Sequence, residues 1–449
     1  MGQRLKLCRV YDRRKEVDMQ MNIRKKIPEW FGHIQSVFLE NGFPLYLVGG
    51  LVRNALMGIP EQDFDCTGPT HPQIIIEKLN GYKGIRAVPK ALAFGTIEIL
   101  CDWKGESLGC EYTTFRKDHY REGGNHIPEE VHFASTLEED AIRRDFTINT
   151  LYYNVASHEL LDPIGGKRDI EKKLIRTTSR DPYLVFKDDG LRLLRMIRFA
   201  CQLKFTIHEE TYQMAKEQIH LLSDISMERI REEFVKILLS DVRYPSLPDS
   251  DGVQAHRRGL EFLLDTGALR YMIPVVLDQH SIEVCIGMPP KVHLRMAGLL
   301  HGIYGQDRKG GEVVRSIMGQ AGLRFDNETI QKTMTLVENQ LLDFDHQADA
   351  AALRIKFASF GYETVMELIA LRKSDGDDLS KWQDILWQMK QEGVPTSIAA
   401  LAIDGRDIME AIGSDPSPQI GKIKKRLYEH VILHPEDNTR EKLLRLLSR

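Results

Sequence analysis

Residues Leu45–Arg53 read Leu-Tyr-Leu-Val-Gly-Gly-Leu-Val-Arg, and the expected fold depends on this stretch. The apolar residues before the glycines predict a short buried strand, and helix-forming residues follow from Leu51 to Met57. A Gly-Gly turn between a strand and a helix lets a phosphate approach the backbone closely and leaves helix N–H groups facing the anion. A plain turn is the commoner use of two glycines, so the pattern needs support from its surroundings. Gly50 is the first candidate nucleotide-binding residue.

Two aspartates on the next expected strand, Asp63 and Asp65, give that support. Alternate strand residues share a face, and adjacent carboxylates repel each other unless a cation neutralises them. Their chemical use is to hold hard divalent ions, which can activate an attacking hydroxyl and stabilise a leaving pyrophosphate. An Asp-x-Asp pair alone is more often a solvated strand, but the preceding turn favours a magnesium site with both aspartates as catalytic ligands. Glu111 is the candidate third carboxylate, with Glu98 and Asp102 as rivals.

Strand and helix signals are mixed up to about residue 155, and only helix signals follow. Strands are expected at 62–66, 95–101, 109–116 and 130–134, and helices at 22–42, 72–79 and 138–144. Beyond this point apolar residues at helical spacing predict helices at 187–202, 208–222, 226–239, 257–266 and 290–303. The predicted fold is therefore an α/β domain with a mixed sheet, followed by all-α domains.

Composition excludes several classes of protein. The 449 residues suggest about three domains, and 42% hydrophobic residues are enough for several cores. A net charge of −4 excludes a uniformly basic surface but not nucleic-acid binding, which depends on local clustering. There is no apolar run long enough for a membrane span.

Six cysteines are scattered without a Cys-x-x-Cys pair. This argues against a disulfide scaffold or a zinc site and favours a reducing, cytoplasmic compartment. Residues 1–21 are expected to form a disordered leader, because the basic and acidic residues at the start lack the apolar stretch of a secretory signal. Met19 or Met21 is an alternative start.

The segment from Leu47 to Asp65 resembles the signature of the nucleotidyltransferase superfamily, in the form used by class II CCA-adding enzymes and bacterial poly(A) polymerases. Later segments are similar to the family's further motifs in order, at 140–149, 162–169, 188–195 and 226–231. Asn54 stands where the family usually has aspartate, and Asp188 where it usually has glutamate. Since Asp63 and Asp65 are both present, neither change predicts an inactive site.

Asp189 and Arg192 lie in a segment predicted to be helical, where a spacing of three places them on one face. A carboxylate accepts and a guanidinium donates, which complements the amino-bearing edges of cytosine and adenine but not those of uracil and guanine. The resemblance implies this use, with CTP and ATP selected without a template. An exposed salt bridge is the alternative. Arg195 and Arg198 continue the face, either to bind triphosphate, to contact a neighbouring domain, or as a solvated surface.

The second motif is implied to bind the sugar and triphosphate of the nucleotide. The candidates are Asp140, Arg143 and Asn149, together with Arg53 of the first motif. A structural ion pair between Arg144 and Asp145 is an alternative use of that motif. The polar stretch 116–128 predicts a mobile loop, whose length resembles that of enzymes that add a complete CCA.

Two segments of the helical half have their own resemblances. Val292–Gly302 is similar to a helix of HD phosphohydrolases, but Gly302 replaces the essential aspartate, so we expect a packing helix that lacks an oxygen ligand for a metal. Residues 403–445 resemble the tRNA-binding end of the family. Gly421 is expected to open a helix that binds backbone phosphates through Lys422, Lys424 and Lys425; lysines on a solvated helix are the alternative.

The resemblance implies addition of CCA to the 3′ end of tRNA from CTP and ATP, with the acceptor stem and T arm as the bound part. CC-only, A-only or poly(A) addition, and a silent RNA-binding relative, are the alternatives. The expected domains are a leader at 1–21, a nucleotidyltransferase head at 22–155, a base-selecting neck at 156–225, a body at 226–380 and a tail at 381–449.

Overall fold

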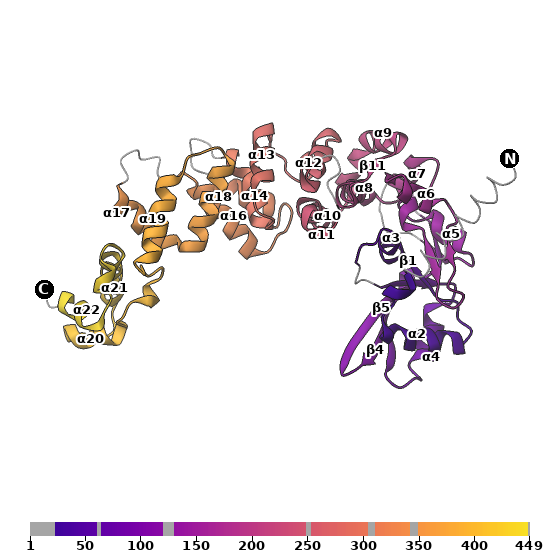
Figure 1. The fold of residues 1–449 in the computed structure, drawn as a ribbon, viewed down its shortest axis with the longest axis horizontal. Helices are drawn as coiled ribbons and strands as arrows, with labels where there is room; N and C mark the ends of the chain where they lie inside the picture. Colours follow the sequence, from indigo (N-terminus) through magenta and orange to yellow (C-terminus); the bar gives the residue numbers. More distant parts are fainter. Residues whose placement is uncertain are drawn as a thin grey trace, which may run out of the picture. The chain divides into compact units, whose positions relative to one another are not determined.

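The computed structural model describes residues 23–60, 64–119, 130–247, 253–303, 310–341 and 349–447 (Figure 1). The predicted leader, Asp63 and most of the predicted loop lie outside the described residues. The chain divides into two compact units, Met1–Pro274 and Val275–Arg449, which are described separately. The domain boundaries expected from the sequence stay predictions.

A mixed sheet of seven strands forms the first part of unit 1. In order across the sheet the strands are β3 (Ile85–Ala91), β4 (Thr96–Trp103), β5 (Glu106–Thr114), β2 (Asp65–Gly68), β1 (Tyr46–Val48), β8 (Tyr152–Asn154) and β9 (Leu160–Leu161). β2 and β5 are parallel, and the other neighbours are antiparallel. The mixed sheet confirms the predicted α/β class, and it continues past residue 155 through β9.

Part of one face of this sheet packs against Ala134 and Ala141, and three helices cover the opposite face. These are α2 (Glu29–Glu40), α3 (Gly50–Leu56) and α4 (Pro72–Leu79). Phe31 and Phe38 of α2 belong to one buried cluster with Tyr112 of β5. Because side chains alternate along a strand, Glu111 lies on the face opposite that of Tyr112.

The rest of unit 1 is mainly helical. The helices are α5 (Leu137–Ile142), α6 (Gly166–Glu171), α7 (Pro182–Asp188), α8 (Leu191–Leu203), α9 (Glu209–Glu217), α10 (Met227–Leu238), α11 (Ser240–Arg243) and α12 (Ala255–Asp265). Short strands pair as β6 (Arg116–His119) with β7 (Glu130–Phe133), and as β10 (Leu174–Ile175) with β11 (Thr206–Ile207). Single 3-10 turns are η1 (Leu92–Phe94), η2 (Thr147–Asn149), η3 (Ile219–Asp224) and η4 (Ala268–Tyr271). α8 is central, because most of its side chains are buried against α10 and α12.

Among its described residues, unit 2 contains helices and no strand, which confirms the predicted all-α half. The α-helices are α13 (Gln279–Gly287), α14 (Val292–Leu300), α15 (Gly310–Met318), α16 (Asn327–Asn339), α17 (Ala350–Phe360), α18 (Tyr362–Ser374), α19 (Ser380–Gln391), α20 (Gly405–Ile412), α21 (Pro418–Leu433) and α22 (Arg440–Leu447). The 3-10 turns are η5 (His301–Ile303), η6 (Ile398–Ala400) and η7 (Pro435–Asp437). In the part of the chain that the structure describes, no helix has both the length and the apolar character needed to cross a membrane.

Candidate functional site

A row of carboxylates lies on the face of the sheet opposite α2 and α4. Asp65 is the first residue of β2 and lies in register with Glu111 of the parallel strand β5. Glu111 in turn lies opposite Glu98 of the antiparallel strand β4. Residues in register on adjacent strands point to the same face, so the three carboxylates are lateral neighbours. Asp102 lies further along β4, opposite Ser107, which leaves Glu111 and Glu98 as the neighbours of Asp65.

Lys90 supplies a positive charge to this row. Its ammonium group lies 2.6 Å from Glu111 Oε2. The hydrogen bond and the charge of Glu111 raise the pKa of Lys90, and Glu98 and Asp65 add smaller contributions in the same direction. The row of acids therefore favours a positive charge beside it.

The Gly-Gly turn brings the backbone close to Asp65. Gly49 has φ +73°, in the left-handed region that favours glycine. A Cβ atom built on Gly49 would lie 3.9 Å from Asp65 Oδ2. The turn is thus within van der Waals reach of the carboxylate, and both glycines line the same cavity as Asp65.

This cavity of unit 1 has a volume of about 820 Å³, within the range of small-molecule sites. Most of the charged groups that line it are cationic. The predicted residues along its wall are Gly50, Arg53, Asp65, Arg143, Asn149, Asp189, Arg192, Arg195 and Arg198. Glu111 and Asp140 do not line it. The structure thus brings together residues from the first, second and fourth sequence motifs, which are the three that contributed candidates in this unit.

Asp145 organises the arginines of the cavity wall. Its Oδ2 accepts two hydrogen bonds from Arg195, at 2.9 and 2.6 Å, and its Oδ1 accepts one from Asn149 Nδ2 at 2.9 Å. Asn149 Oδ1 accepts a bond of 2.6 Å from Arg53 Nη1. Burial opposes ionisation, but the charge of Arg195 and the bond from Asn149 hold the pKa of Asp145 well below its usual range. The network fixes Arg53 and Arg195 in place before any ligand arrives.

Phe199 is a second organiser, and sequence analysis missed it. Its ring faces the guanidinium groups of Arg198, Arg53 and Arg195, whose carbons lie 4.0, 5.1 and 5.3 Å from the ring centroid. Cation–π contacts of this kind hold like charges close together at low cost. Arg198 also pairs with the buried Glu233 of α10. The alternative of a solvated face for Arg195 and Arg198 is therefore wrong, since both are largely covered and paired.

The predicted pair Asp189 and Arg192 lines the cavity, but the expected helical spacing is wrong. Asp189 has extended backbone angles between α7 and α8, and α8 starts only at Leu191. Asp189 Oδ2 accepts a bond of 2.9 Å from Arg229 Nη2 of α10. Arg192 is buried and donates to the carbonyl groups of Arg143 and Val185, at 2.7 and 3.1 Å.

Arg229 lies within the fifth motif, yet sequence analysis assigned it no role. Its contact with Asp189 joins segments far apart in the chain, and no local pattern shows such a contact. Lys236, Arg243 and Tyr244 also line the cavity and were missed. Tyr244 explains the departure at Asn54, whose buried amide donates to the tyrosine hydroxyl at 3.0 Å and accepts from Arg53 Nε at 2.9 Å.

Asp140 lies behind the cavity wall. Its carboxylate is fully buried and accepts hydrogen bonds from Arg143, Arg144 and the hydroxyl of Tyr152, at 2.5 to 3.0 Å. The alternative pair of Arg144 with Asp145 is wrong, because Arg144 binds Asp140 and Asp145 binds Arg195. Asp140 thus holds Arg143 at the cavity from behind.

Replacing Asp140 by asparagine is expected to lower the free energy of unfolding by about 3–5 kcal/mol, because Arg143 and Arg144 lose their buried counter-charge. Urea unfolding at neutral pH measures this, with the exposed Asp102→Asn as a control that should change it by less than about 0.5 kcal/mol. Equal stability of the Asp140 variant and the parent would contradict the role.

The same carboxylate predicts a pH dependence. Burial alone would raise the pKa of Asp140, but Arg144 and Arg143 lower it from 3.8 to about 2. Because the pKa of Asp140 is lower in the folded than in the unfolded state, its ionised carboxylate stabilises the fold at pH values above 3.8. This stabilisation is lost as the pH falls from 3.8 through 2. The loss amounts to about 2 kcal/mol in the parent and should be absent from Asp140→Asn.

The lysines of the predicted tail site lie on α21 of unit 2. The helix begins at Pro418, so the expectation that Gly421 opens it is wrong. Lys422 and Lys425 are exposed and Lys424 is half-buried. No ion pair of these three is found among the described residues, which leaves their ammonium groups to solvent.

Three family models match the chain. Residues 45–176 match the poly(A) polymerase head domain, and residues 204–247 match the RNA- and SrmB-binding site of polymerase A. Residues 312–447 match domain 2 of tRNA nucleotidyltransferases. The matches follow one another in the order expected for a single family.

Curated relatives agree with the family models. The CCA-adding enzyme of Lactococcus lactis subsp. lactis (strain IL1403) is 29% identical over 420 residues, 91% of this chain and 94% of that protein. The CCA-adding enzyme of Lactobacillus helveticus is 37% identical over 219 residues, 47% of this chain and 51% of that protein.

Solved structures share the fold. A crystal structure of the Bacillus stearothermophilus CCA-adding enzyme with CTP has a TM-score of 0.70 and 22% identity, and covers 94% of this chain and 98% of that chain. The Thermotoga maritima CCA-adding enzyme with tRNA has a TM-score of 0.66 and 19% identity, and covers 95% of this chain and 97% of that chain. With five ordered motifs, a cavity that gathers most of their candidate residues and three successive family models, the chain belongs to the family of class II tRNA nucleotidyltransferases and bacterial poly(A) polymerases.

Proposed function

We propose that this protein adds CCA to the 3′ end of tRNA, using CTP and ATP and releasing pyrophosphate. The observation that carries the proposal is the cavity of unit 1. It joins a carboxylate beside a Gly-Gly turn, a set of fixed arginines and an Asp/Arg pair in one space of nucleotide size. Relatives that match most of the chain are CCA-adding enzymes.

Enzymes of this family use divalent metal ions, and we assign magnesium to the carboxylates of the sheet. Asp65 fits this role, because it is exposed, lines the cavity together with Gly49 and lies next to the acid Glu111. Carboxylate oxygens are the ligands that magnesium prefers. Asp63 is the second proposed ligand. A bound magnesium ion supplies Lewis-acid stabilisation of charge on the phosphate oxygens.

The arginines of the cavity bind and orient the triphosphate. Arg53 and Arg195 are held by Asn149 and Asp145, so their donors need no rearrangement when an anion arrives. Preorganised donors stabilise charge that develops on phosphate more effectively than mobile ones. Their position aligns the α-phosphorus for attack by the 3′ hydroxyl of tRNA, and positioning supplies much of the rate.

Asp189 and Arg192 select the base. The Asp189 carboxylate accepts from the amino group of cytosine or adenine, and the Arg192 guanidinium donates to the adjacent ring nitrogen. Uracil and guanine would place a carbonyl against the carboxylate and an N–H against the guanidinium. Each such mispairing costs about 1–3 kcal/mol, and the site therefore favours CTP and ATP.

Incubation with defined tRNAs tests the function. The full chain and Mg²⁺ are combined with tRNAs that end before CCA, after CC or after the complete CCA, each with a single NTP or with CTP and ATP. We expect CC from CTP alone, A on the CC-ended tRNA from ATP, and no extension of the complete tRNA.

The other outcomes identify the alternatives. Addition that stops after CC indicates CC-only addition. Addition of A that occurs only on a tRNA with a CC end indicates A-only addition. Long A tails indicate a poly(A) polymerase. No incorporation in any combination, with tRNA binding intact, indicates a silent RNA-binding relative and contradicts the proposal.

The acceptor stem and T arm of tRNA are the proposed partner of α21. Replacing Lys422 and Lys425 together by alanine should weaken tRNA binding, because each lysine that contacts a phosphate releases about one counterion. The slope of log affinity against log salt should fall by about one per lysine. Lys390→Ala on α19, another exposed helical lysine of unit 2, is the matched control and should leave the slope unchanged. An unchanged slope in the double variant would contradict the assignment.

The cytoplasm is the proposed site of the reaction. The described cysteines, Cys66, Cys101, Cys110, Cys201 and Cys285, are free and buried, and none forms a disulfide with another. Free thiols are typical of proteins in reducing compartments, where tRNA maturation would find its substrates.

A further inference from the structure

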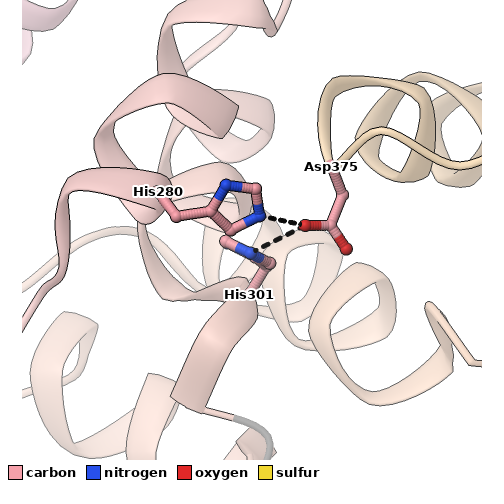
Figure 2. A group of neighbouring side chains, drawn as sticks. All are labelled: His280, His301 and Asp375. Carbon is pink, nitrogen blue, oxygen red and sulfur yellow. Dashed lines mark hydrogen bonds and ion pairs between the residues drawn. The ribbon is translucent and has the colours of Figure 1, made fainter.

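Unit 2 brings together two histidines and an aspartate that the proposed reaction does not use (Figure 2). His280 lies in the first turn of α13, His301 follows α14, and Asp375 follows α18. Their ligand atoms all lie within 4.8 Å of one another. Asp375 Oδ1 is 2.6 Å from His280 Nε2 and 3.3 Å from His301 Nε2.

The hydrogen bonds of His301 determine which of its nitrogens faces the cluster. Its Nδ1 lies 2.8 Å from the carbonyl oxygen of Gly298, which can only accept, so Nδ1 carries the proton. In a neutral ring, Nε2 then presents a lone pair towards the cluster. A backbone carbonyl behind the ring is the usual support of a metal-binding histidine. Gln340 Nε2 also donates to the His301 carbonyl at 2.8 Å, which holds the backbone in position.

A lone pair on His301 Nε2 faces a carboxylate oxygen that also only accepts. Two acceptors at 3.3 Å repel each other unless a proton or a cation lies between them. A metal ion removes the conflict, because it takes lone pairs from the carboxylate and from both rings.

The donor set and its spacing suit a transition metal. Zinc binds imidazole nitrogen and carboxylate oxygen at about 2.0–2.2 Å, which places tetrahedral ligand atoms about 3.3 Å apart. The two nitrogen–oxygen distances of 2.6 and 3.3 Å need only small movements to reach this arrangement. Imidazole favours zinc, copper, iron or nickel over magnesium. Three protein ligands leave a fourth position for water.

The sequence predicted that this segment is a packing helix without an oxygen ligand for a metal, and helix α14 is largely buried. Gly302 does follow His301, but Asp375 supplies the oxygen from the end of α18. The carboxylate lies far from the histidine in sequence, so the local motif could not show it. With one carboxylate and two histidines, the cluster corresponds to a single ion that joins three helix ends.

We propose that His280, His301 and Asp375 bind one divalent zinc-like transition-metal ion, which fastens the start of α13 to the ends of α14 and α18. The ion would be additional to the magnesium of the nucleotidyl site. Its role is to stabilise unit 2, because a ligand that binds only the folded state raises stability in proportion to its occupancy.

Calorimetric titration with zinc chloride tests the site. The full chain is stripped with a chelator and titrated in excess Mg²⁺, which occupies sites made of oxygen ligands. We expect one zinc ion per chain and a higher melting temperature for unit 2 when zinc is present. His301→Gln and Asp375→Asn should each weaken zinc binding by at least about 100-fold, since losing even a supporting residue costs 10- to 100-fold.

His293→Gln is the matched control. His293 Nε2 lies 2.9 Å from Glu367, but Lys291 already neutralises that carboxylate, so no metal is expected there. His280→Gln removes a proposed ligand without disturbing the core, because the His280 ring is 55% exposed and its replacement should not unfold the unit. A loss of zinc binding in this variant is therefore not explained by misfolding. Circular dichroism confirms folding of each variant.

The proposal is overturned if the parent binds no stoichiometric zinc under these conditions. It is also overturned if the folded His280→Gln variant binds zinc as tightly as the parent, or if His293→Gln loses as much affinity. Nucleotide incorporation is a separate readout, so failure of the proposed function and failure of this site are distinguishable.

Discussion

Asp65→Asn is expected to reduce nucleotide incorporation by about 10³-fold or more. Asp65 borders the cavity beside the Gly-Gly turn and is a proposed magnesium ligand. Asparagine keeps the size and one oxygen but removes the negative charge that attracts a divalent ion. Removing a single preorganised electrostatic group from an active site costs about 10²–10³ in rate, and weaker metal binding adds to that loss.

Single-turnover incorporation of labelled CTP into tRNA that ends before CCA measures the effect. Binding of tRNA should change little, because Asp65 is on the sheet of unit 1 and the proposed tRNA lysines are on α21. Asp102→Asn is the matched control, since it removes the same charge from a neighbouring strand away from the row. Normal incorporation by Asp65→Asn, or an equal loss in Asp102→Asn, would refute the metal assignment.

The carboxylate end of the cavity could be predicted because its signals are local. A strand, two glycines, a helix and an acid on the next strand are close in sequence, and side-chain alternation decides which residues share a face. The same rule could not choose between Glu111 and Glu98. Both lie in the row of Asp65, and only the register of β4, β5 and β2 shows it.

Sequence analysis predicted that Asp189 and Arg192 belong to the site, and both line the cavity, but it did not predict their geometry. Apolar spacing suggested one helix from 187 to 202, whereas Asp189 lies in an extended break before α8. Gly190 marks the break, because a Cβ atom there would lie 2.8 Å from the carbonyl oxygen of Leu221. The periodicity of apolar residues along the sequence cannot show a tertiary contact such as that between Gly190 and Leu221.

The ion pairs that fix the arginines could not be predicted from sequence. Asp145 with Arg195, Arg198 with Glu233 and Asp189 with Arg229 each join different elements. The sequence contains many acidic residues that could pair with each arginine. Only the folded structure shows which of them is buried beside it. The same reasoning explains why Asp375 was missed as a neighbour of His301.

Asp189→Ala is expected to relax base selection and to weaken the use of the correct nucleotides. Without the carboxylate, the amino group of cytosine or adenine loses its acceptor, and the carbonyl group of uracil or guanine no longer meets a repelling charge. At about 1–3 kcal/mol per unsatisfied group, kcat/KM for CTP and ATP should fall about 5- to 150-fold. The ratio of CTP to UTP incorporation should narrow by a similar factor.

Arg192→Lys tests the second residue of the Asp189–Arg192 pair. Lysine still fills the buried position, so the variant leaves no cavity there. Lysine keeps the charge but lacks the planar fork that donates two bonds in fixed directions. We expect a loss of selectivity in the same direction as for Asp189→Ala. Because the two residues recognise one base edge, the double variant should lose less than the sum of the two single effects.

Asp188→Asn is the control for this pair, because it removes one negative charge at the adjacent position, which does not line the cavity. Competition between CTP and UTP on tRNA that ends before CCA gives the ratio directly. Nucleotide affinity is measured in parallel, so that loss of triphosphate binding is not mistaken for loss of base recognition. If Asp189→Ala keeps the parental ratio of CTP to UTP, or if Asp188→Asn changes it equally, Asp189 and Arg192 do not read the base.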